Sequence, residues 1–157
     1  MRVIWQKILR KEGGIDMLCK ELQIGDWITD NHGFKWQIIC VGDDYAYATF
    51  EGNEADPWEF DDKDDQPEPI EITEDILKQN KWEVQGYTLF PSEHCYVKDE
   101  GRNHLLWRHG TLSIWLAYGE AIDIVFSDVT APCKYVHQLQ QVLRLAGMTD
   151  MANNFKV

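Results

Sequence analysis

The clearest fold signal in the chain lies near its end and reads TAPCKYVHQLQQVLRLAG from Thr130 to Gly147. Thr130 and Pro132 are typical of the start of a helix, and Gly147 is typical of its end. Apolar residues between them recur at helical spacing and form one stripe: Tyr135, Val136, Leu139, Val142, Leu143 and Ala146. Polar residues fall on the opposite face: His137, Gln140, Gln141 and Arg144. We therefore predict an amphipathic helix whose polar face meets solvent.

The segment before this helix is typical of a β-hairpin. Apolar residues alternate with others in two runs, 112–118 and 122–126. A two-residue turn would put their apolar residues on opposite faces, whereas a three-residue loop from Gly119 to Ala121 pairs Tyr118 with Ile122 and unites them. We predict the three-residue loop. Because neither apolar face can be buried alone, we expect the helix to cover the hairpin.

Nearer the N-terminus the pattern is also β. Three runs rich in β-branched and aromatic residues, 27–29, 34–41 and 45–50, are separated by turn residues. Their short spacing predicts antiparallel pairing, as in an SH3-like small barrel or a curled sheet. A fourth strand is expected at 58–60 or at 69–72.

The middle of the chain supplies a short helix and more strands. Thr73 is a typical N-cap for a helix through about residue 79, and strand-like runs follow at 83–90, 95–98 and 104–107. We therefore predict an α+β fold in which a second antiparallel sheet is covered by the C-terminal helix. Three parts are expected: an N-terminal helical extension (1–16), a small antiparallel β subdomain with an acidic segment (17–72), and an α+β subdomain with the C-terminal helix (73–157).

The composition is that of a globular chain. Of 157 residues, 44% are hydrophobic and 12% are aromatic, which is enough apolar surface for a core. The longest stretch without a charged residue, from His109 to Gly119, is too short to cross a bilayer. The first residues lack the apolar core of a secretory signal. We therefore expect a cytoplasmic protein with no membrane contact.

The net charge of −12 is concentrated in one segment. Between Gly42 and Asp75 there are 14 acidic residues and one basic residue, Lys63, whereas the remaining 13 acidic and 14 basic residues nearly balance. Such a field repels phosphate backbones, so we expect no direct binding of nucleic acid. The segment is either a solvated loop or a contact for a basic partner.

Trp58 and Phe60 lie next to the densest run of acidic residues in this segment. Trp58 and Phe60 either anchor a basic partner or tuck both rings into the core from an edge strand. The linker-like stretch of aspartates that follows would imitate the charge of a nucleic acid if its carboxylates were held rigidly. The candidate partner surface combines these residues with the polar helix face: Trp58, Phe60, Asp61, Asp62, Asp64, Asp65, His137, Gln140, Gln141 and Arg144.

The sequence contains no recognised catalytic or cofactor motif. Its four cysteines lie far apart, and of their surroundings only Cys133-x-x-x-His137 approaches the spacing of a zinc site. We therefore predict no catalytic residue, no cofactor and no metal. Two alternatives stay open: a metal-assisted hydrolase that uses clustered carboxylates near a histidine, and a small-molecule binding module with an apolar pocket lined by Trp107 and Trp115.

Three stretches carry a likeness to known proteins: ELQIGDWI from Glu21 to Ile28, PIEITEDIL from Pro69 to Leu77, and KYVHQLQQVLRLAG from Lys134 to Gly147. Together they resemble a family of small uncharacterised proteins carried by prophages and other mobile elements of gut bacteria. The resemblance begins near Met17, so residues 1–16 are an extension or an upstream reading of the start codon. It implies a cytoplasmic accessory product with no catalytic residues to carry over. We therefore predict a non-enzymatic interaction protein of a prophage or mobile element.

Overall fold

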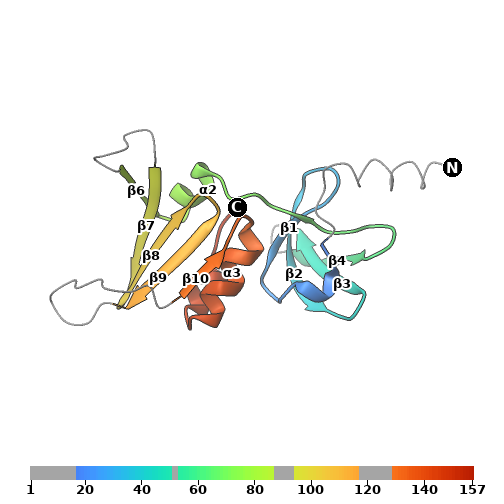
Figure 1. Cartoon of the computed structure of the whole chain (residues 1–157). Helices are drawn as coiled ribbons and strands as arrows, with labels where there is room; N and C mark the ends of the chain where they lie inside the picture. The colour runs from blue at the N-terminus through green and yellow to red at the C-terminus, as the bar shows by residue number, and fades with distance from the viewer. Residues whose placement is uncertain (1–16, 51–52, 87–93, 117–128) are drawn as a thin grey trace. The chain divides into compact units, whose positions relative to one another are not determined.

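The computed structural model describes residues 17–50, 53–86, 94–116 and 129–157 (Figure 1). The chain divides into two compact units, Met1–Ile70 and Glu71–Val157. Each unit contains an antiparallel sheet of five strands, and the second also contains the C-terminal helices. The predicted α+β fold is therefore confirmed. The sequence placed the boundary between the two subdomains two residues later, after residue 72.

The sheet of the first unit has the strand order β4-β3-β2-β1-β5. Its strands are β1 (Trp27–Thr29), β2 (Lys35–Val41), β3 (Tyr45–Phe50), β4 (Asn53–Asp61) and β5 (Glu68–Pro69). Both expected positions of a fourth strand are thus occupied, one by β4 and one by β5. Register shifts in the pairing of β2 with β3 and of β3 with β4 bend these strands. The result is the curled sheet rather than the closed barrel, because β4 and β5 are its two edges within the described residues.

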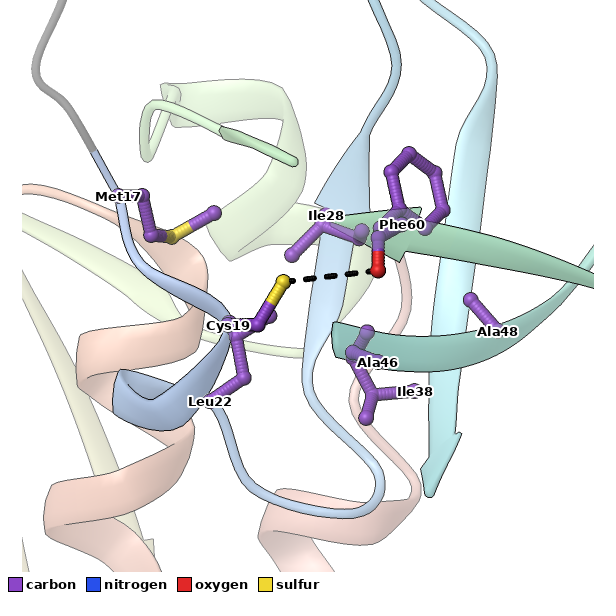
Figure 2. Close-up of a cluster of buried hydrophobic side chains, with 8 residues drawn as sticks. All are labelled: Met17, Cys19, Leu22, Ile28, Ile38, Ala46, Ala48 and Phe60. Atoms are coloured by element: carbon purple, nitrogen blue, oxygen red, sulfur yellow. Dashed lines mark hydrogen bonds between the residues drawn. The ribbon is translucent and has the colours of Figure 1, made fainter. Parts of the chain in front are cut away.

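The core of the first unit lies on one face of this sheet (Figure 2). Side chains from four strands meet there with side chains from a short 3-10 helix, η1 (Cys19–Glu21), and its flanks: Met17, Cys19, Leu22, Ile28, Ile38, Ala46, Ala48 and Phe60. The Cys19 thiol donates a hydrogen bond of 3.7 Å to the backbone carbonyl of Phe60, which ties η1 to β4. Burial, together with a hydrogen bond to Asp62, raises the pKa of Cys19 to about 12. This thiol is therefore a packed core group at neutral pH.

The sheet of the second unit has the order β10-β9-β8-β7-β6. Its strands are β6 (Glu83–Gly86), β7 (His94–Glu100), β8 (Asn103–Arg108), β9 (Thr111–Leu116) and β10 (Val129–Pro132). Consecutive strands pair, and the two-residue loop between β8 and β9, His109-Gly110, has φ of 48° and 74°. Positive φ at both positions is the geometry of a tight hairpin turn, and glycine at the second position favours it.

Strand β10 corrects one sequence prediction. Thr130 and Pro132 were expected to open the last helix, but Thr130 pairs with Ser113 and Pro132 pairs with Thr111. Proline is tolerated here because β10 is an edge strand and Pro132 is its last residue. The helix itself begins four residues later, at Val136.

Three helices belong to the second unit: α2 (Glu74–Gln79), α3 (Val136–Leu145) and α4 (Thr149–Asn153). The Thr73 hydroxyl accepts a hydrogen bond of 3.3 Å from the backbone N–H of Ile76, so the predicted N-cap of α2 is confirmed. Gly147, with φ of 83°, ends α3. Helix α4 was not predicted from the sequence. Figure 1 shows α3 beside β10.

The core of the second unit contains the apolar side of α3 and inward residues of β8 and β9: Leu105, Leu112, Ile114, Val136, Leu139 and Leu143. Of the predicted helix stripe, Val136, Leu139 and Leu143 are fully buried, whereas Tyr135, Val142 and Ala146 are half-buried. The buried side of α3 is therefore shifted from the predicted stripe toward Gln140, which is 0% exposed. The helix covers the second sheet, as expected from the pattern.

Some predictions lie outside the described residues: the helix within 1–16, the loop from Gly119 to Ala121 and the strand at 122–126. All four cysteines are free thiols, and three of them are buried. No helix in the described part of the chain is both long enough and apolar enough to span a bilayer.

Candidate protein-interaction surface

Strand β4 carries its two aromatic residues, Trp58 and Phe60, on one face of the first sheet. Phe60 lies opposite Ala46 and Trp58 lies opposite Ala48. Phe60 is fully buried, whereas the side chain of Trp58 is 52% exposed. The expectation that Phe60 contributes to a partner surface is therefore wrong, because its ring completes the core. Trp58, two residues earlier on the same strand, stays accessible.

Trp58 is the end of a row of aromatic rings. Its ring centroid lies 6.3 Å from that of Trp36, which lies 5.4 Å from that of Phe50, which in turn lies 5.8 Å from that of Phe34. We call these four residues the aromatic row. Phe34 is 55% exposed, and Trp36 and Phe50 are half-buried. Neighbouring exposed aromatic rings of this kind are typical of interaction sites in soluble proteins.

Carboxylates hold both indole rings of the aromatic row. The Trp36 indole N–H donates to Asp30 Oδ2 at 3.0 Å, and the Trp58 indole N–H donates to Asp65 Oδ2 at 2.5 Å. Each ring therefore has a fixed orientation, with a carboxylate at its edge. The aromatic row and these two aspartates together form what we call the aromatic–acidic surface: Asp30, Phe34, Trp36, Phe50, Trp58 and Asp65.

Asp30 organises the end of this surface near Phe34. Its Oδ1 accepts hydrogen bonds of 2.9 Å from the backbone N–H groups of both His32 and Phe34. Burial alone would raise the pKa of Asp30, but the hydrogen bonds from Trp36, Phe34 and His32 outweigh it and lower the pKa below 3.8. The carboxylate is therefore negatively charged at neutral pH.

The stretch 61–65 is a hydrogen-bonded turn, which corrects the expectation of an exposed linker. The Asp61 carboxylate accepts the backbone N–H of Lys63 at 2.7 Å and that of Asp64 at 2.6 Å. The backbone N–H of Asp64 lowers the pKa of Asp61 most, burial opposes it, and the N–H of Lys63 lowers it further. The backbone N–H of Asp61 also bonds the carbonyl of Asp65 at 3.0 Å, which closes the turn.

Asp62 anchors this turn to the body of the unit. Its Oδ1 accepts the backbone N–H of Cys19 at 2.7 Å, and its own N–H donates to the carbonyl of Asp44 at 3.1 Å. Asp61 and Asp62 thus use their carboxylates to hold the backbone, whereas Asp64 is exposed. The predicted cluster of aspartates therefore has three different roles. Asp61 and Asp62 hold the backbone, Asp65 binds the Trp58 indole, and Asp64 faces solvent.

This arrangement suits binding better than catalysis. Flat aromatic faces accept lysine and arginine side chains through cation–π interactions, and aromatic surfaces also bind proline-rich segments. The fixed carboxylates at the indole edges add attraction for positive charge. The sequence analysis missed Asp30, Phe34, Trp36 and Phe50. The sequence feature that could have found two of them is the spacing of Phe34 and Trp36. They lie two residues apart directly after a turn, which puts both side chains on one face of a strand.

The polar face of α3 is not the solvent-exposed surface expected from the sequence. Gln140 is 0% and His137 is 8% exposed. The Gln140 side-chain amide donates to the carbonyl of Ala152 at 2.9 Å, and the Arg144 Nε donates to Asn153 Oδ1 at 3.2 Å. Both contacts belong to α4, which covers this side of α3. The residues therefore join two helices, and of the expected four only Gln141 and Arg144 retain partial exposure.

Residues near the end of β10 do not form a metal site. Cys133 is fully buried, and burial raises the pKa of its thiol to about 12. The His137 ring stacks on Tyr135 with centroids 6.0 Å apart. Over the described residues, no group of three or more histidine, cysteine, aspartate or glutamate side chains is placed to hold a metal ion.

Two pockets of the second unit bear on the open alternatives. One of about 400 Å³ has a mixed apolar and polar lining: Trp107 with Glu71, Ile72, His109, Gly110 and Lys134. The Trp115 side chain lies outside the described part. The other, of about 490 Å³, brings acidic residues near a histidine: Glu83, Asp99, Glu100 and His104. In it, His104 Nδ1 lies 2.5 Å from Asp99 Oδ1 on the neighbouring strand.

Comparison of the chain with protein-family models, with curated proteins and with solved structures finds no match. The resemblance to proteins of prophages and mobile elements therefore stays a prediction that rests on the three quoted stretches. The geometry of the aromatic–acidic surface stands independently of it.

Proposed function

We propose that the chain is a non-enzymatic interaction protein whose first unit binds a basic segment of a partner protein on the aromatic–acidic surface. The observation that carries this proposal is Trp58: its ring is 52% exposed, yet its indole N–H is fixed by Asp65 at 2.5 Å. A large apolar group that is both rigid and exposed loses little conformational entropy when a partner covers it. Such residues are the usual anchors of protein interfaces.

The sign of the partner's charge follows from the surroundings of this ring. The segment from Gly42 to Asp75 has 14 acidic residues and one basic residue. Asp30 and Asp65 place negative charge at the edges of the row itself. Lysine and arginine side chains gain both from these carboxylates and from the ring faces. The partner segment is therefore rich in lysine or arginine, with apolar or proline residues between them that contact the rings.

The biological setting is part of the same proposal. The resemblance to proteins of prophages and mobile elements supports a cytoplasmic accessory role in which the basic partner is a host or phage protein. In that setting the acidic surface competes with nucleic acid for a basic binding protein, since it presents carboxylates where nucleic acid presents phosphates.

Peptide binding to the full chain tests the proposal. The probes are fluorescent peptides in which lysine or arginine alternates with proline or leucine, and the same peptides with glutamine at every basic position. We expect saturable binding of the basic peptides only. We expect Trp58→Ala to weaken that binding about tenfold or more, as truncation of an interface anchor does. High salt should weaken it as well, because the contacts are between charges.

A matched control comes from the other face of the same sheet. Tyr45 is 39% exposed and alternates with the inward-facing Ala46, so Tyr45→Ala removes an exposed ring without touching the row. Equal losses in Tyr45→Ala and Trp58→Ala would refute the proposed surface. A peptide of residues 1–16, which carries Arg2, Lys7, Arg10 and Lys11, is the competitor. If it displaces every other peptide, the surface serves this chain and the proposal of a partner protein fails.

A further inference from the structure

The two carboxylates of the aromatic–acidic surface differ in how much of their hydrogen-bonding capacity the fold already uses. An ionised carboxylate has about four acceptor positions. The Oδ1 of Asp30 accepts the backbone N–H groups of His32 and Phe34, both at 2.9 Å. Its Oδ2 accepts the Trp36 indole N–H at 3.0 Å. Asp30 therefore fixes its own loop and has little capacity left for a partner.

Asp65 keeps most of this capacity open. Its Oδ2 accepts the indole N–H of Trp58 at 2.5 Å, and among the residues that the structure describes no donor bonds its Oδ1. Lys63, the single basic residue between Gly42 and Asp75, forms no ion pair within the described ranges. The bond between Asp65 and Trp58 lies at the surface, so a group of a partner can approach this carboxylate.

The ring of Trp58 offers a partner its face and not its N–H group. The residue is 52% exposed, and its N–H is already bonded to Asp65. The planes of Trp58 and Trp36 are tilted by 40° with centroids 6.3 Å apart, so the two rings are not stacked face to face. Because an indole N–H lies in the plane of its ring, the Asp65 carboxylate stands at the edge of the exposed ring. A flat cation on the ring face would therefore have this carboxylate beside it.

Arginine and lysine would use this arrangement differently. A guanidinium group is planar, stacks on aromatic rings, and directs its five N–H donors outward in its own plane. It can lie on the Trp58 ring and at the same time donate to the Asp65 carboxylate at the ring edge. An ammonium group is a compact, strongly hydrated point charge. It can contact either the ring face or the carboxylate, because it has no flat extension to reach both.

We propose that the basic segment carries an arginine over Trp58, whose guanidinium stacks on the indole and donates to Oδ1 of Asp65. This inference rests on the proposed function and adds to it, since the partner is then selected for arginine and not for positive charge alone. Trp58 and Asp65 set that preference. Asp30 contributes charge but no direct bond, because its acceptor positions already hold the loop.

Fluorescence anisotropy with the full chain tests this preference. The probes are three labelled peptides of the same length, in which proline or leucine separates positions filled by arginine, by lysine or by citrulline. Citrulline keeps the planar shape of arginine and removes its charge. We expect the arginine peptide to bind about tenfold more tightly than the lysine peptide, because it gains charge-assisted hydrogen bonds to the carboxylate. The citrulline peptide should bind more weakly than either.

Two aspartate variants locate the preference. Asp65→Asn keeps an acceptor oxygen for the Trp58 indole and removes the charge, so the ratio of arginine to lysine affinity should fall from about ten to about one. Asp64→Asn removes the same charge from the exposed neighbouring residue, and the ratio should stay unchanged. A fourth peptide with asymmetric dimethylarginine keeps the charge and blocks the donors of one terminal nitrogen. Its affinity for the wild type should fall toward that of the lysine peptide, which decides the question even if Asp65→Asn does not fold.

The two proposals fail by different results. If the arginine and lysine peptides bind equally well, or if dimethylarginine binds as tightly as arginine, the surface responds to charge alone. This inference is then overturned while the proposed function stands. Equal ratios for Asp65→Asn and Asp64→Asn would also overturn it, because the preference would not depend on the carboxylate beside Trp58. If none of the basic peptides binds, the proposed function fails and this inference fails with it.

Discussion

The two sheets of this protein have the same number of strands but are covered to different extents. In the second unit, α3 packs on the sheet and α4 packs on α3, so that even Gln140 and His137 are buried. In the first unit the only helix among the described residues is η1, which is three residues long. There Phe34 and Trp58 stay more than half exposed. The amount of helix that each sheet receives therefore decides whether its large side chains become core or surface.

The tryptophans of the two units show the same contrast in a different form. Trp58 is half exposed, yet its N–H is bound to Asp65 at 2.5 Å. Trp82 is 3% exposed, yet its N–H has no partner in the described structure. Exposed apolar area thus indicates a binding surface in the first unit, whereas the Trp82 indole lies inside the second unit.

The largest expected effect separates the two aromatic residues of β4. Phe60→Ala removes a fully buried ring from the core of the first unit and should lower the free energy of unfolding by about 3–5 kcal/mol. Trp58→Ala removes a ring that is 52% exposed and should cost less than about 1 kcal/mol. Denaturant unfolding followed by circular dichroism measures both. Similar costs at the two positions would mean that Trp58 belongs to the core and is not a free anchor.

A smaller effect tests how the second unit is covered. Leu139→Ala should lower the free energy of unfolding by about 2–5 kcal/mol, because Leu139 is fully buried on α3. Leu145→Ala is the control on the same helix: its side chain is 88% exposed, so the change should stay within about 0.5 kcal/mol. Thermal unfolding of the two variants beside the wild type measures this difference. A melting curve of Leu139→Ala that overlays the wild type would contradict the packing of α3 on the sheet.

The smallest effect concerns the acidic turn of the first unit. Because the folded pKa of Asp61 lies below its ordinary value of 3.8, its charge stabilises the fold above about pH 4. That contribution is lost as the pH falls through the folded pKa, where the carboxylate binds a proton. Asp61→Asn keeps an acceptor oxygen and removes the charge, so stability should depend less steeply on pH below about 4, where the wild-type carboxylate takes up its proton.

The control for this pH effect is Asp64→Asn. Asp64 is exposed. The two backbone hydrogen bonds of the turn are accepted by the Asp61 carboxylate and not by that of Asp64. Unfolding midpoints measured in steps of pH for the wild type and both variants give the comparison. Identical pH profiles for Asp61→Asn and wild type would show that the turn does not hold Asp61 as described.

Local patterns predicted much of the fold because each rests on neighbouring residues. The N-cap at Thr73, the end of α3 at Gly147 and the strands around Trp36 and Trp107 follow from side chains within a few positions. Strand β10 was missed because the residue types of 129–132 suit a helix start as well as an edge strand. Only its pairing with β9 distinguishes the two.

The candidate site could be predicted only in part. Trp58 and the aspartates stood out in the sequence because aromatic and acidic residues lie side by side there. Phe34 and Phe50 did not, since they join Trp58 through pairing of three strands. Which of the aspartates bonds the Trp58 indole could not be predicted either, because only the folded turn brings Asp65 to that ring.

By itself, the sequence determined the α+β class, the concentration of negative charge in one segment and the amphipathic character of the last helix, because composition and short-range periodicity fix these properties. Only the tertiary structure decided that Phe60 is core while Trp58 is surface, and that Gln140 is buried beneath α4. Burial depends on which distant segment covers a side chain. That choice is made by long-range packing, in which residues far apart in the chain compete for the same apolar face.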